Sequence, residues 1–465
     1  MIPRVEKYRT GLSPWELYRG IFQDARESFF LDSIDYQGSD QRYSYIGANP
    51  AATLTLANGR LRWQGEVSGQ APAGELSRVL RRLLGRERLR RTGGTPQGPD
   101  FFTGGAVGFW GYELARWFEK IRFRVKPGPA TPDLYLGLFR EMVIYDHKLK
   151  RYHLALWPRK GDGRFEMAEF RARLACAEKR MRDSGARGFS IRNFRPEMTR
   201  SRFEAMVRRA KAYIAAGDIY QANLSQRFCF DFEGSSLKLY DALRTANPSP
   251  FCSFLNFGGL QVISSSPERL VRKRARLCET KPIAGTRGYR PGHDLKALEK
   301  ELLAHPKERA EHIMLVDLER NDLGRVCDWR SVQVKEMMKI ERYARVIHLV
   351  SKITGRLSRG RDALDLLAAV FPGGTITGCP KVRCMQVIDE LEPVRRGLYT
   401  GSIGYLDFKG DMDLNIVIRT LILEKNKGYL QVGAGIVHDS DPAREYEETL
   451  HKAEALAEAL AKASA

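Results

Sequence analysis

The sequence predicts an α+β fold in two parts, and three observations lead to this prediction. Short runs of strand-forming residues recur in the first part, such as AATLTLANGRLRW at 51–63. Helical and strand patterns alternate irregularly in the second part. A polar and basic stretch at 183–196 separates the two. We therefore divide the 465 residues into an N-terminal region, 1–190, and a second region, 195–460.

The first elements follow from local patterns. The run EMVIYDHKLKRYHLALW at 141–157 predicts a hairpin with a polar turn, whereas the composition of residues 92–100 predicts a loop. Ser201 and Glu204 are three residues apart and form a capping box, which predicts the start of a helix. Gly217 predicts its end.

Further strands and helices are expected beyond this helix. Alternating apolar and polar residues at 219–232 predict a strand, and residues 260–271 predict another. A helix is expected from about Leu295 to Leu323. The last helix should run from Pro442 to Ala463, because Ser440 and Asp441 supply an N-cap and a proline then occupies the first turn.

Charge and cysteine content restrict the function classes. A net charge of +21 is typical of proteins that bind nucleic acids or anionic substrates. The arginines are interspersed with Leu, Gly and Asp and form no nucleic-acid-binding motif, so we expect a basic surface and no nucleic-acid partner. Seven scattered cysteines, none in a C-x-x-C pair, argue against a disulfide framework and against structural zinc.

Two observations on apolar segments argue against a membrane protein. No apolar run approaches the length of a membrane helix. The first residues, MIPRVEKYRTGL, lack the apolar stretch of a signal peptide. We therefore expect a cytoplasmic protein with no membrane partner.

Two helices carry pairs of carboxylates. Glu308 and Glu311 share a helix face, and Glu445 and Glu448 repeat the spacing, with Lys452 one turn further on. Such pairs are usually solvated surface. If the two faces met, however, they would form an oxygen-rich site suited to magnesium, which needs few protein carboxylates and completes its shell with water and an anionic ligand.

Two glycine-rich segments have the composition of site loops. FPGGTITGCPKVR at 371–383 combines glycines and threonines, and Gly433-Ala434-Gly435 ends an expected strand before the last helix. Glycines let backbone N–H groups approach a carboxylate closely, although ordinary turns use them as well. Neither segment is a phosphate-binding G-x-x-x-x-G-K-[ST] loop.

Taken together, these motifs make the chain resemble the chorismate-utilising enzymes. The resemblance is dense from about residue 200 to 455 and looser before that. It rests on these stretches: GDIYQANLSQRF, SSSPERL, PIAGTR, KERAEHIMLVDLERNDLGR, HLVSKITG, GGTITGCPKVRCMQVIDELEP, YTGSIGY, MDLNIVIRT and GAGIVHDSDPAREYEET. It implies two large antiparallel sheets packed together, helices on the outside, chorismate in the cleft, and 195–460 as the catalytic region.

The resemblance also assigns roles to single residues. It implies magnesium bound through Glu311 and Glu448, with Glu308 and Glu445 acting directly or through water. Glu268 of SSSPERL matches a general acid that protonates the departing C4 hydroxyl, which requires a raised pKa. The alternative for Glu268 is a surface pair with Arg269.

The remaining matched positions would bind or orient chorismate. Tyr399 and Arg419 match residues that hold the enolpyruvyl carboxylate, a task suited to a bidentate guanidinium. Lys452 would hold the ring carboxylate or a neighbouring glutamate, and His348 would set substrate geometry or handle a proton. The other matched positions are loop and strand residues near the substrate: Gly285, Thr286, Gly433, Ala434 and Gly435.

Gln221 separates the branches of this family. Members that use water carry a lysine base at this position, and a glutamine amide cannot act as a base. The resemblance therefore implies ammonia as the nucleophile. It also implies a separate glutamine amidotransferase subunit, because the chain has no G-x-C-x-G nucleophile motif of its own.

Ala284 leaves two ammonia-using branches open. Aminodeoxychorismate synthases usually have a lysine nucleophile here, in PIKGT, and anthranilate synthases do not. The other motifs, among them YQANLSQ, SSSPERL and GSIGYLDF, are more similar to those of aminodeoxychorismate synthases. The tryptophan-site segments of anthranilate synthases, LLES and PYMF, are replaced by FLDS and PFCSF. We therefore expect amination at C4, with anthranilate synthesis as the alternative.

The sequence also leaves two non-enzymatic alternatives. The chain could be a protein of this fold that has lost catalysis, or a basic protein that binds nucleic acids. Retention of Glu268, Glu311, Arg419 and Glu448 argues against the first. A salt-dependent interaction with DNA would support the second.

Overall fold

The computed structural model describes most of the chain. The described residues are 2–22, 25–34, 41–85, 99–124, 126–159, 161, 163–183, 188–289, 292–343 and 346–464. All but two residues of the loop expected at 92–100 lie outside them.

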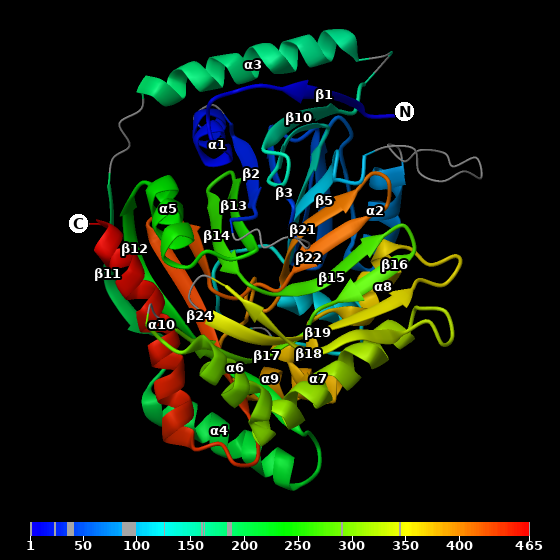
Figure 1. Cartoon of the computed structure of the whole chain (residues 1–465). Helices are drawn as coiled ribbons and strands as arrows, with labels where there is room; N and C mark the ends of the chain where they lie inside the picture. Colours follow the sequence, from blue (N-terminus) through cyan, green and yellow to red (C-terminus); the bar gives the residue numbers. More distant parts are fainter. Residues whose placement is uncertain are drawn as a thin grey trace.

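The core of the molecule is two antiparallel sheets, each twelve-stranded (Figure 1). The strands of the first sheet are, in spatial order, β1 Arg4–Tyr8, β10 Arg151–Leu156, β9 Glu141–Asp146, β3 Tyr43–Ala48, β2 Glu27–Asp32, β13 Phe251–Phe257, β14 Leu260–Ser266, β23 Thr420–Glu424, β24 Lys427–Ile436, β12 Gln221–Gly234 and β11 Phe189–Pro196, with β20 Gly378–Cys379 beside β12. Strands from both sides of residue 190 therefore share this sheet.

The second sheet also combines both parts of the chain. Its strands are, in spatial order, β17 Ile283–Gly288, β19 Val346–Arg356, β16 Leu277–Thr280, β15 Arg269–Arg274, β22 Met412–Asn415, β21 Ser402–Asp407, β7 Gly105–Trp110, β8 Leu134–Phe139, β4 Ala52–Ala57, β5 Arg60–Gly65 and β6 Gly69–Pro72, with β18 Gln333–Arg342 beside β19. The centre of this sheet is the pairing of β21 with β7.

Helices surround the sheets in Figure 1. The α-helices are α1 Pro14–Phe22, α2 Leu76–Gly85, α3 Arg164–Asp183, α4 Arg200–Ala215, α5 Ser236–Ala246, α6 Leu295–Ala304, α7 Pro306–Gly324, α8 Ala363–Val370, α9 Lys381–Leu391 and α10 Pro442–Ser464. Three short 3-10 helices are η1 Ala73–Glu75, η2 Tyr112–Trp117 and η3 Gly374–Ile376. Apolar side chains of α1, α3, α5 and α10 bury strands of the first sheet, and those of α2, α7 and α8 bury strands of the second. Among the described residues, no helix combines the length and the apolar character that crossing a membrane requires.

An aromatic cluster joins the two sheets. Phe29 of β2 and Phe139 of β8 meet edge to face, with ring centroids 4.6 Å apart. Phe257 of β13 stacks on Tyr135 of β8 at 4.2 Å. These rings are largely buried and belong to a continuous apolar core between the sheets. Burial on this scale supplies the main driving force for docking one sheet on the other.

Several predicted elements are confirmed. The hairpin at 141–157 is β9 and β10, which pair in register from Glu141↔Leu156 to Asp146↔Arg151. The strand at 219–232 is β12. The last helix is α10, and the Asp441 carboxylate accepts hydrogen bonds from the N–H groups of Ala443 and Arg444.

Three other predictions were wrong in detail. Residues 260–271 form two strands, because Pro267 interrupts the run and the chain passes from the first sheet to the second. The long helix at 295–323 is two helices, α6 and α7, since the residue before Pro306 is extended. Helix α4 is capped by Thr199, not by Ser201. The predicted end of helix α4 at Gly217, in contrast, is confirmed, because this glycine follows the helix with a φ of +79°.

Candidate active site

The predicted site residues gather between α7, α10 and the strand ends that face them. Gln221 opens β12, and Gly433, Ala434 and Gly435 lie on β24. Strands β12 and β24 are direct neighbours, with Asn223↔Gly435 and Ser225↔Gly433 in register. The long β12 strand therefore brings residues more than 200 positions apart into one place.

Gln221 holds a predicted metal ligand. Its buried side-chain amide donates a hydrogen bond to Glu311 Oε1 at 2.9 Å. A Cβ on Gly435 would lie 2.6 Å from Gln221 Nε2 and 3.9 Å from Glu311 Oε1, so only glycine leaves room for this contact. Three predicted residues thus meet at one point, and the glutamine acts as a donor toward a carboxylate.

Gly433 lies against the predicted carboxylate-binding tyrosine. A Cβ at this position would be 2.7 Å from the Tyr399 hydroxyl and 2.5 Å from Asn223 Oδ1. The Asn223 oxygen is buried and has no hydrogen-bond partner within the described part of the chain. An unpaired polar atom beside a tyrosine hydroxyl indicates a place for a polar ligand.

Helix α10 contributes a half-exposed charge pair. Lys452 Nζ lies 2.6 Å from Glu448 Oε1 and donates to the Gly433 carbonyl at 3.0 Å. Lys452 thus holds a neighbouring glutamate, one of its two expected roles. Burial, together with the charge of Glu448, raises the pKa of Glu445.

Strand β17, which carries Ala284, faces helix α7. Gly285 has a φ of +77°, and a Cβ there would lie 2.8 Å from Glu308 Oε2. Glu308 accepts a hydrogen bond from Arg287 at 3.0 Å. Ala284 is buried and pairs with Leu349 of β19. Strand β17 therefore lies against the first turn of α7 without a lysine at position 284.

His348 is neutral at physiological pH. Its Nδ1 lies 2.7 Å from the Thr286 hydroxyl, while its buried Nε2 has no partner among the described residues. Burial, with the Arg419 charge as a second cause, lowers the pKa of His348 to about 3. The ring can therefore orient a ligand through Nε2 but carries no charge.

Glu268 lies where the chain crosses from β14 in the first sheet to β15 in the second. It is buried, and this burial raises its pKa to about 7, against the opposing effects of Thr375, the Ile283 N–H and Arg419. A carboxyl group with this pKa keeps a proton near neutral pH, as a general acid must.

The alternative pairing of Glu268 with Arg269 is wrong. The Arg269 guanidinium donates to Asp413 at 3.0 Å and to Glu279 at 3.1 Å instead.

Arg419 lies at a second crossing between the sheets, from β22 to β23. The two crossings are bonded to each other, because Ser265 N–H donates to the Arg419 carbonyl at 3.1 Å and Ile416 N–H donates to the Glu268 carbonyl at 3.0 Å. Arg419 has a φ of +50°, a conformation that costs energy in a non-glycine residue and is concentrated at functional sites. Among the described residues, its side chain donates a single, long hydrogen bond, to Asn247 Oδ1 at 3.4 Å.

The predicted metal ligands are carboxylates, a type of group that magnesium binds. They do not form a closed metal site by themselves. Among the described residues, no group of three or more His, Cys, Asp or Glu side chains is placed to hold a metal ion. The candidates are all carboxylate oxygens on α7 and α10, and the two on α10 repel each other. Oxygen donors of this kind suit magnesium, which needs few protein carboxylates and keeps several waters.

Two features were missed by the sequence analysis. Glu319 on α7 is buried, and burial together with nearby Glu268 raises its pKa. Its place at helical spacing from His312 and Leu315 on a buried face would have indicated this. The 371–383 loop is anchored on α7 through Lys381, which forms a buried ion pair with Asp322 at 2.5 Å.

The chain is similar to known proteins over most of its length. A family described as chorismate binding enzyme matches residues 31–458. The chain is 39% identical over 466 residues to "Anthranilate synthase component 1" of Aquifex aeolicus (strain VF5), covering 96% of this chain and 92% of the relative. It is 40% identical over 428 residues to "Aminodeoxychorismate synthase component 1" of Bacillus subtilis (strain 168), covering 90% and 89%.

Solved structures share the architecture. Anthranilate synthase component I from Streptococcus pneumoniae TIGR4 is similar with a TM-score of 0.77 and 36% identity, over 90% of this chain and 93% of that one. The menaquinone-specific isochorismate synthase MenF from Escherichia coli has a TM-score of 0.71 at 18% identity, over 98% and 94%, and shows the fold alone. The predicted fold of two large antiparallel sheets with outer helices is confirmed.

Proposed function

The chain belongs to the family of chorismate binding enzymes, and we propose that it aminates chorismate at C4 with ammonia to give 4-amino-4-deoxychorismate. Chorismate loses its C4 hydroxyl as water, and the amine takes its place. The single observation that carries amination is the Gln221–Glu311 hydrogen bond, because an amide committed as a donor cannot activate water.

The residues of this chain would divide the work as follows. Protonated Glu268 gives its proton to the departing hydroxyl, which a pKa of about 7 permits. Arg419 and the Tyr399 hydroxyl hold the enolpyruvyl carboxylate, and Arg419 has few competing partners. Neutral His348 orients the ring through Nε2.

Magnesium is part of this proposal. Glu311 and Glu448 would hold it, with Glu308 and Glu445 binding directly or through water. When bound, the ion would neutralise the ring carboxylate of chorismate. Burial and, second, the charge of Glu448 raise the pKa of Glu445, and a bound cation would lower it again by favouring the ionised carboxylate.

The ammonia would come from a separate glutamine amidotransferase subunit. Both named relatives are designated component 1, which implies another component in each case. The chain itself lacks a G-x-C-x-G nucleophile motif, so hydrolysis of glutamine would take place on the partner.

Anthranilate synthesis is the second candidate, and Ala284 favours it. This residue is buried against Leu349 and offers no nucleophile for a covalent step. The relative from Aquifex aeolicus and the structure from Streptococcus pneumoniae are both called anthranilate synthases. The C4 proposal draws its support from the YQANLSQ, SSSPERL and GSIGYLDF motifs.

Product identity separates the two candidates. The purified chain is incubated with chorismate, magnesium and ammonium salt, and the products are resolved by mass. We expect a product that retains the enolpyruvyl group and yields 4-aminobenzoate with a lyase. Anthranilate and pyruvate would instead establish the second candidate.

A further inference from the structure

The predicted general acid, Glu268, has a second carboxyl group close to it. Glu319 lies on α7, about two turns beyond Glu311, and is only 6% exposed. The charge of Glu268 contributes to the raised pKa of Glu319, so the two carboxyl groups are near each other. None of the steps of the proposed reaction uses Glu319.

The link between β16 and β17 contacts both carboxyl groups. Thr280 ends β16, and its hydroxyl adjoins the Glu319 carboxyl. Ile283 begins β17, and its N–H donates a hydrogen bond to Glu268 Oε1 at 3.4 Å. Only two residues separate these contacts, so the link joins the surroundings of the two groups.

The short helix η3 makes a second connection. The Thr375 hydroxyl adjoins the Glu268 carboxyl. A Cβ on the neighbouring Gly374 would lie 2.4 Å from the side chain of Leu318, which precedes Glu319 on α7. Helix η3 therefore contacts Glu268 and also the turn of α7 that carries Glu319.

Three oxygen atoms in this region are buried and have no hydrogen-bond partner of ordinary geometry among the described residues. They are Glu319 Oε2, Thr280 Oγ1 and Thr375 Oγ1. Such atoms cost stability, and a role in the reaction would account for that cost. A hydroxyl group can accept one proton while it donates another, so both threonines can relay a proton.

The surroundings of Glu319 favour its protonated form. Burial is the largest cause of its raised pKa, and the charges of Glu268 and Asp322 raise it further, against the effects of Thr280 and Lys381. Lys381 forms a buried ion pair with Asp322. Two neighbouring buried carboxyl groups resist ionising together, so the pair of Glu268 and Glu319 retains at least one proton near neutral pH.

The proposed reaction consumes the proton of Glu268. As the C4–O bond breaks, this proton leaves with the hydroxyl as water, and ammonia bonds to the carbon as an ammonium group. Glu268 is left as a carboxylate. It needs one proton before it can act as an acid again.

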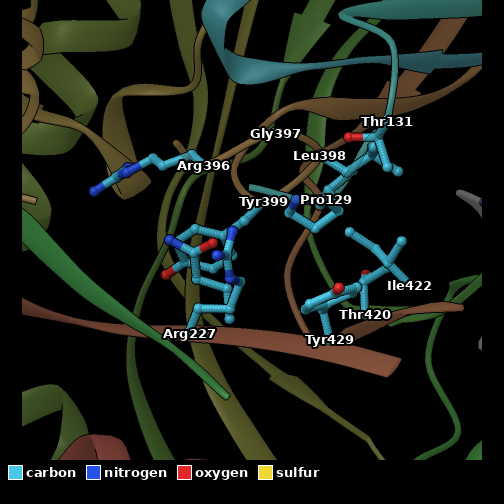
Figure 2. A pocket seen from close by; sticks show the side chains of 12 residues that line it. Pro129, Thr131, Arg227, Arg396, Gly397, Leu398, Tyr399, Thr420, Ile422 and Tyr429 are labelled. Atoms are coloured by element: carbon cyan, nitrogen blue, oxygen red, sulfur yellow. The ribbon is translucent and has the colours of Figure 1, made fainter. Parts of the chain in front are cut away.

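The pocket behind Tyr399 does not supply this proton. Figure 2 shows Arg227, Arg396, Tyr399 and Tyr429 around it, and these are the ionisable side chains among its lining residues. Arginine keeps its proton in proteins, and burial raises the pKa of both tyrosines. Glu319, in contrast, is a carboxylic acid that can pass a proton to a carboxylate.

We propose that Glu319 is a positioning residue that acts through Glu268 and holds a second proton for it. After Glu268 has protonated the departing hydroxyl, the O–H bond of Glu319 breaks, and its proton passes along the Thr280 and Thr375 hydroxyls to the Glu268 carboxylate. Glu319 is then a carboxylate and regains a proton from solvent after the product has left. This inference rests on the proposed function, through Glu268 as the general acid.

The pH profile of kcat/KM at constant free ammonia tests this relay. While the pair holds one proton, the fraction of that proton on Glu268 does not depend on pH, so activity should fall by roughly threefold or less per pH unit above about 7. A lone acid loses about tenfold per pH unit. We expect Glu319→Gln to show this steep fall, because the amide has no proton to give.

A matched pair of variants tests the route. Thr280→Val removes the hydroxyl next to Glu319 and keeps the shape of the side chain, whereas Thr280→Ser keeps the hydroxyl. The valine variant should show the steep profile and the serine variant the shallow one. A purely structural role of Thr280 would scale the whole profile and leave its slope as it is.

Equal slopes in Glu319→Gln and the unchanged protein would overturn the inference, and so would equal slopes in the two Thr280 variants. The Thr280 comparison decides if Glu319→Gln does not fold. Both candidate reactions expel the C4 hydroxyl, so formation of anthranilate would refute the proposed product and leave this test in force.

Discussion

Two glycines of the first sheet have opposite surroundings. Gly47 on β3 pairs with Phe29 on β2, and a Cβ there would lie 2.4 Å from the Phe29 ring. Gly433 on β24 pairs with Ser225, and a Cβ there would meet Asn223 Oδ1 and the Tyr399 hydroxyl. The first glycine makes room for an aromatic ring, and the second makes room for polar groups.

The difference shows how one sandwich serves two purposes. Around Gly47 the space between the sheets is filled with rings, and this packing stabilises the fold. Around Gly433 the same space is lined by unpaired or charged groups, which cost stability and provide chemistry. Substitutions in the two regions should therefore change different quantities.

The largest effect is expected from Glu268→Gln in the polar region. The amide cannot give a proton to the leaving hydroxyl, so kcat should fall by about 10² to 10⁴, measured with chorismate and ammonium salt. The thermal unfolding temperature should change little, because the replacement has the same shape. If this variant had a normal kcat, Glu268 would not be the general acid of the reaction.

The pH dependence sharpens this prediction. Activity needs protonated Glu268, so kcat/KM at constant free ammonia should fall as pH rises above about 7, the pKa of this group. The pKa of Glu268 in the folded protein lies above the usual value for a glutamate. Protonated Glu268 therefore stabilises the fold fully at pH values below that usual value, and this stabilisation is lost as pH rises through about 7. Glu268→Gln should abolish both slopes, as unfolding and rate profiles would reveal.

Phe29→Ala tests the aromatic region. Removing a fully buried ring that contacts Phe139 should lower the free energy of unfolding by about 3–5 kcal/mol. The kcat of the folded fraction should be unchanged, because the ring is distant from the polar region in the strand order. Denaturant titration measures the first quantity, and Phe29→Leu is the milder control. A loss of kcat without loss of stability would contradict the division into two regions.

Gly433→Ala should show an intermediate effect. The added methyl group would press on Asn223 and Tyr399, at a cost of about 1–3 kcal/mol. If this cost falls on substrate binding, KM for chorismate rises by roughly five- to 150-fold. Gly47→Ala, where the added methyl group would meet the Phe29 ring in the aromatic region, is the control and should leave KM near its normal value. Equal KM values in both variants would show that Gly433 does not adjoin the substrate.

The smallest effect is expected from Lys452→Met. The ammonium is half exposed and pairs with Glu448 on the helix surface, so its loss should change KM by only about two- to fivefold. Lys452→Arg should restore most of this loss. A drop in kcat of several orders of magnitude would instead give Lys452 a direct part in the reaction.

Short sequence patterns correctly predicted those elements that depend on local interactions. The Asp441 cap, the 141–157 hairpin and the β12 strand follow from short patterns, and all are present. The motifs also led to Gln221 and Glu311, which meet in the fold.

What the sequence could not predict is where the chain changes sheets. Residues on both sides of Pro267 have strand character, and nothing local says that they join different sheets. The raised pKa of Glu268 depends on this crossing and on burial by distant segments. Glu319 differs from Glu268, because its helical spacing from His312 and Leu315 could have indicated a buried face, whereas its raised pKa depends on tertiary contacts.

The strand order has a consequence for folding during synthesis on the ribosome. Strand β12 has its partner β24 about 200 residues later, and β7 near the N-terminus pairs with β21 at 402–407. A nascent chain that has released only its first 400 residues can complete neither sheet. Its strand edges stay unpaired until roughly the last seventh of the sequence is released, and chaperones protect such exposed edges.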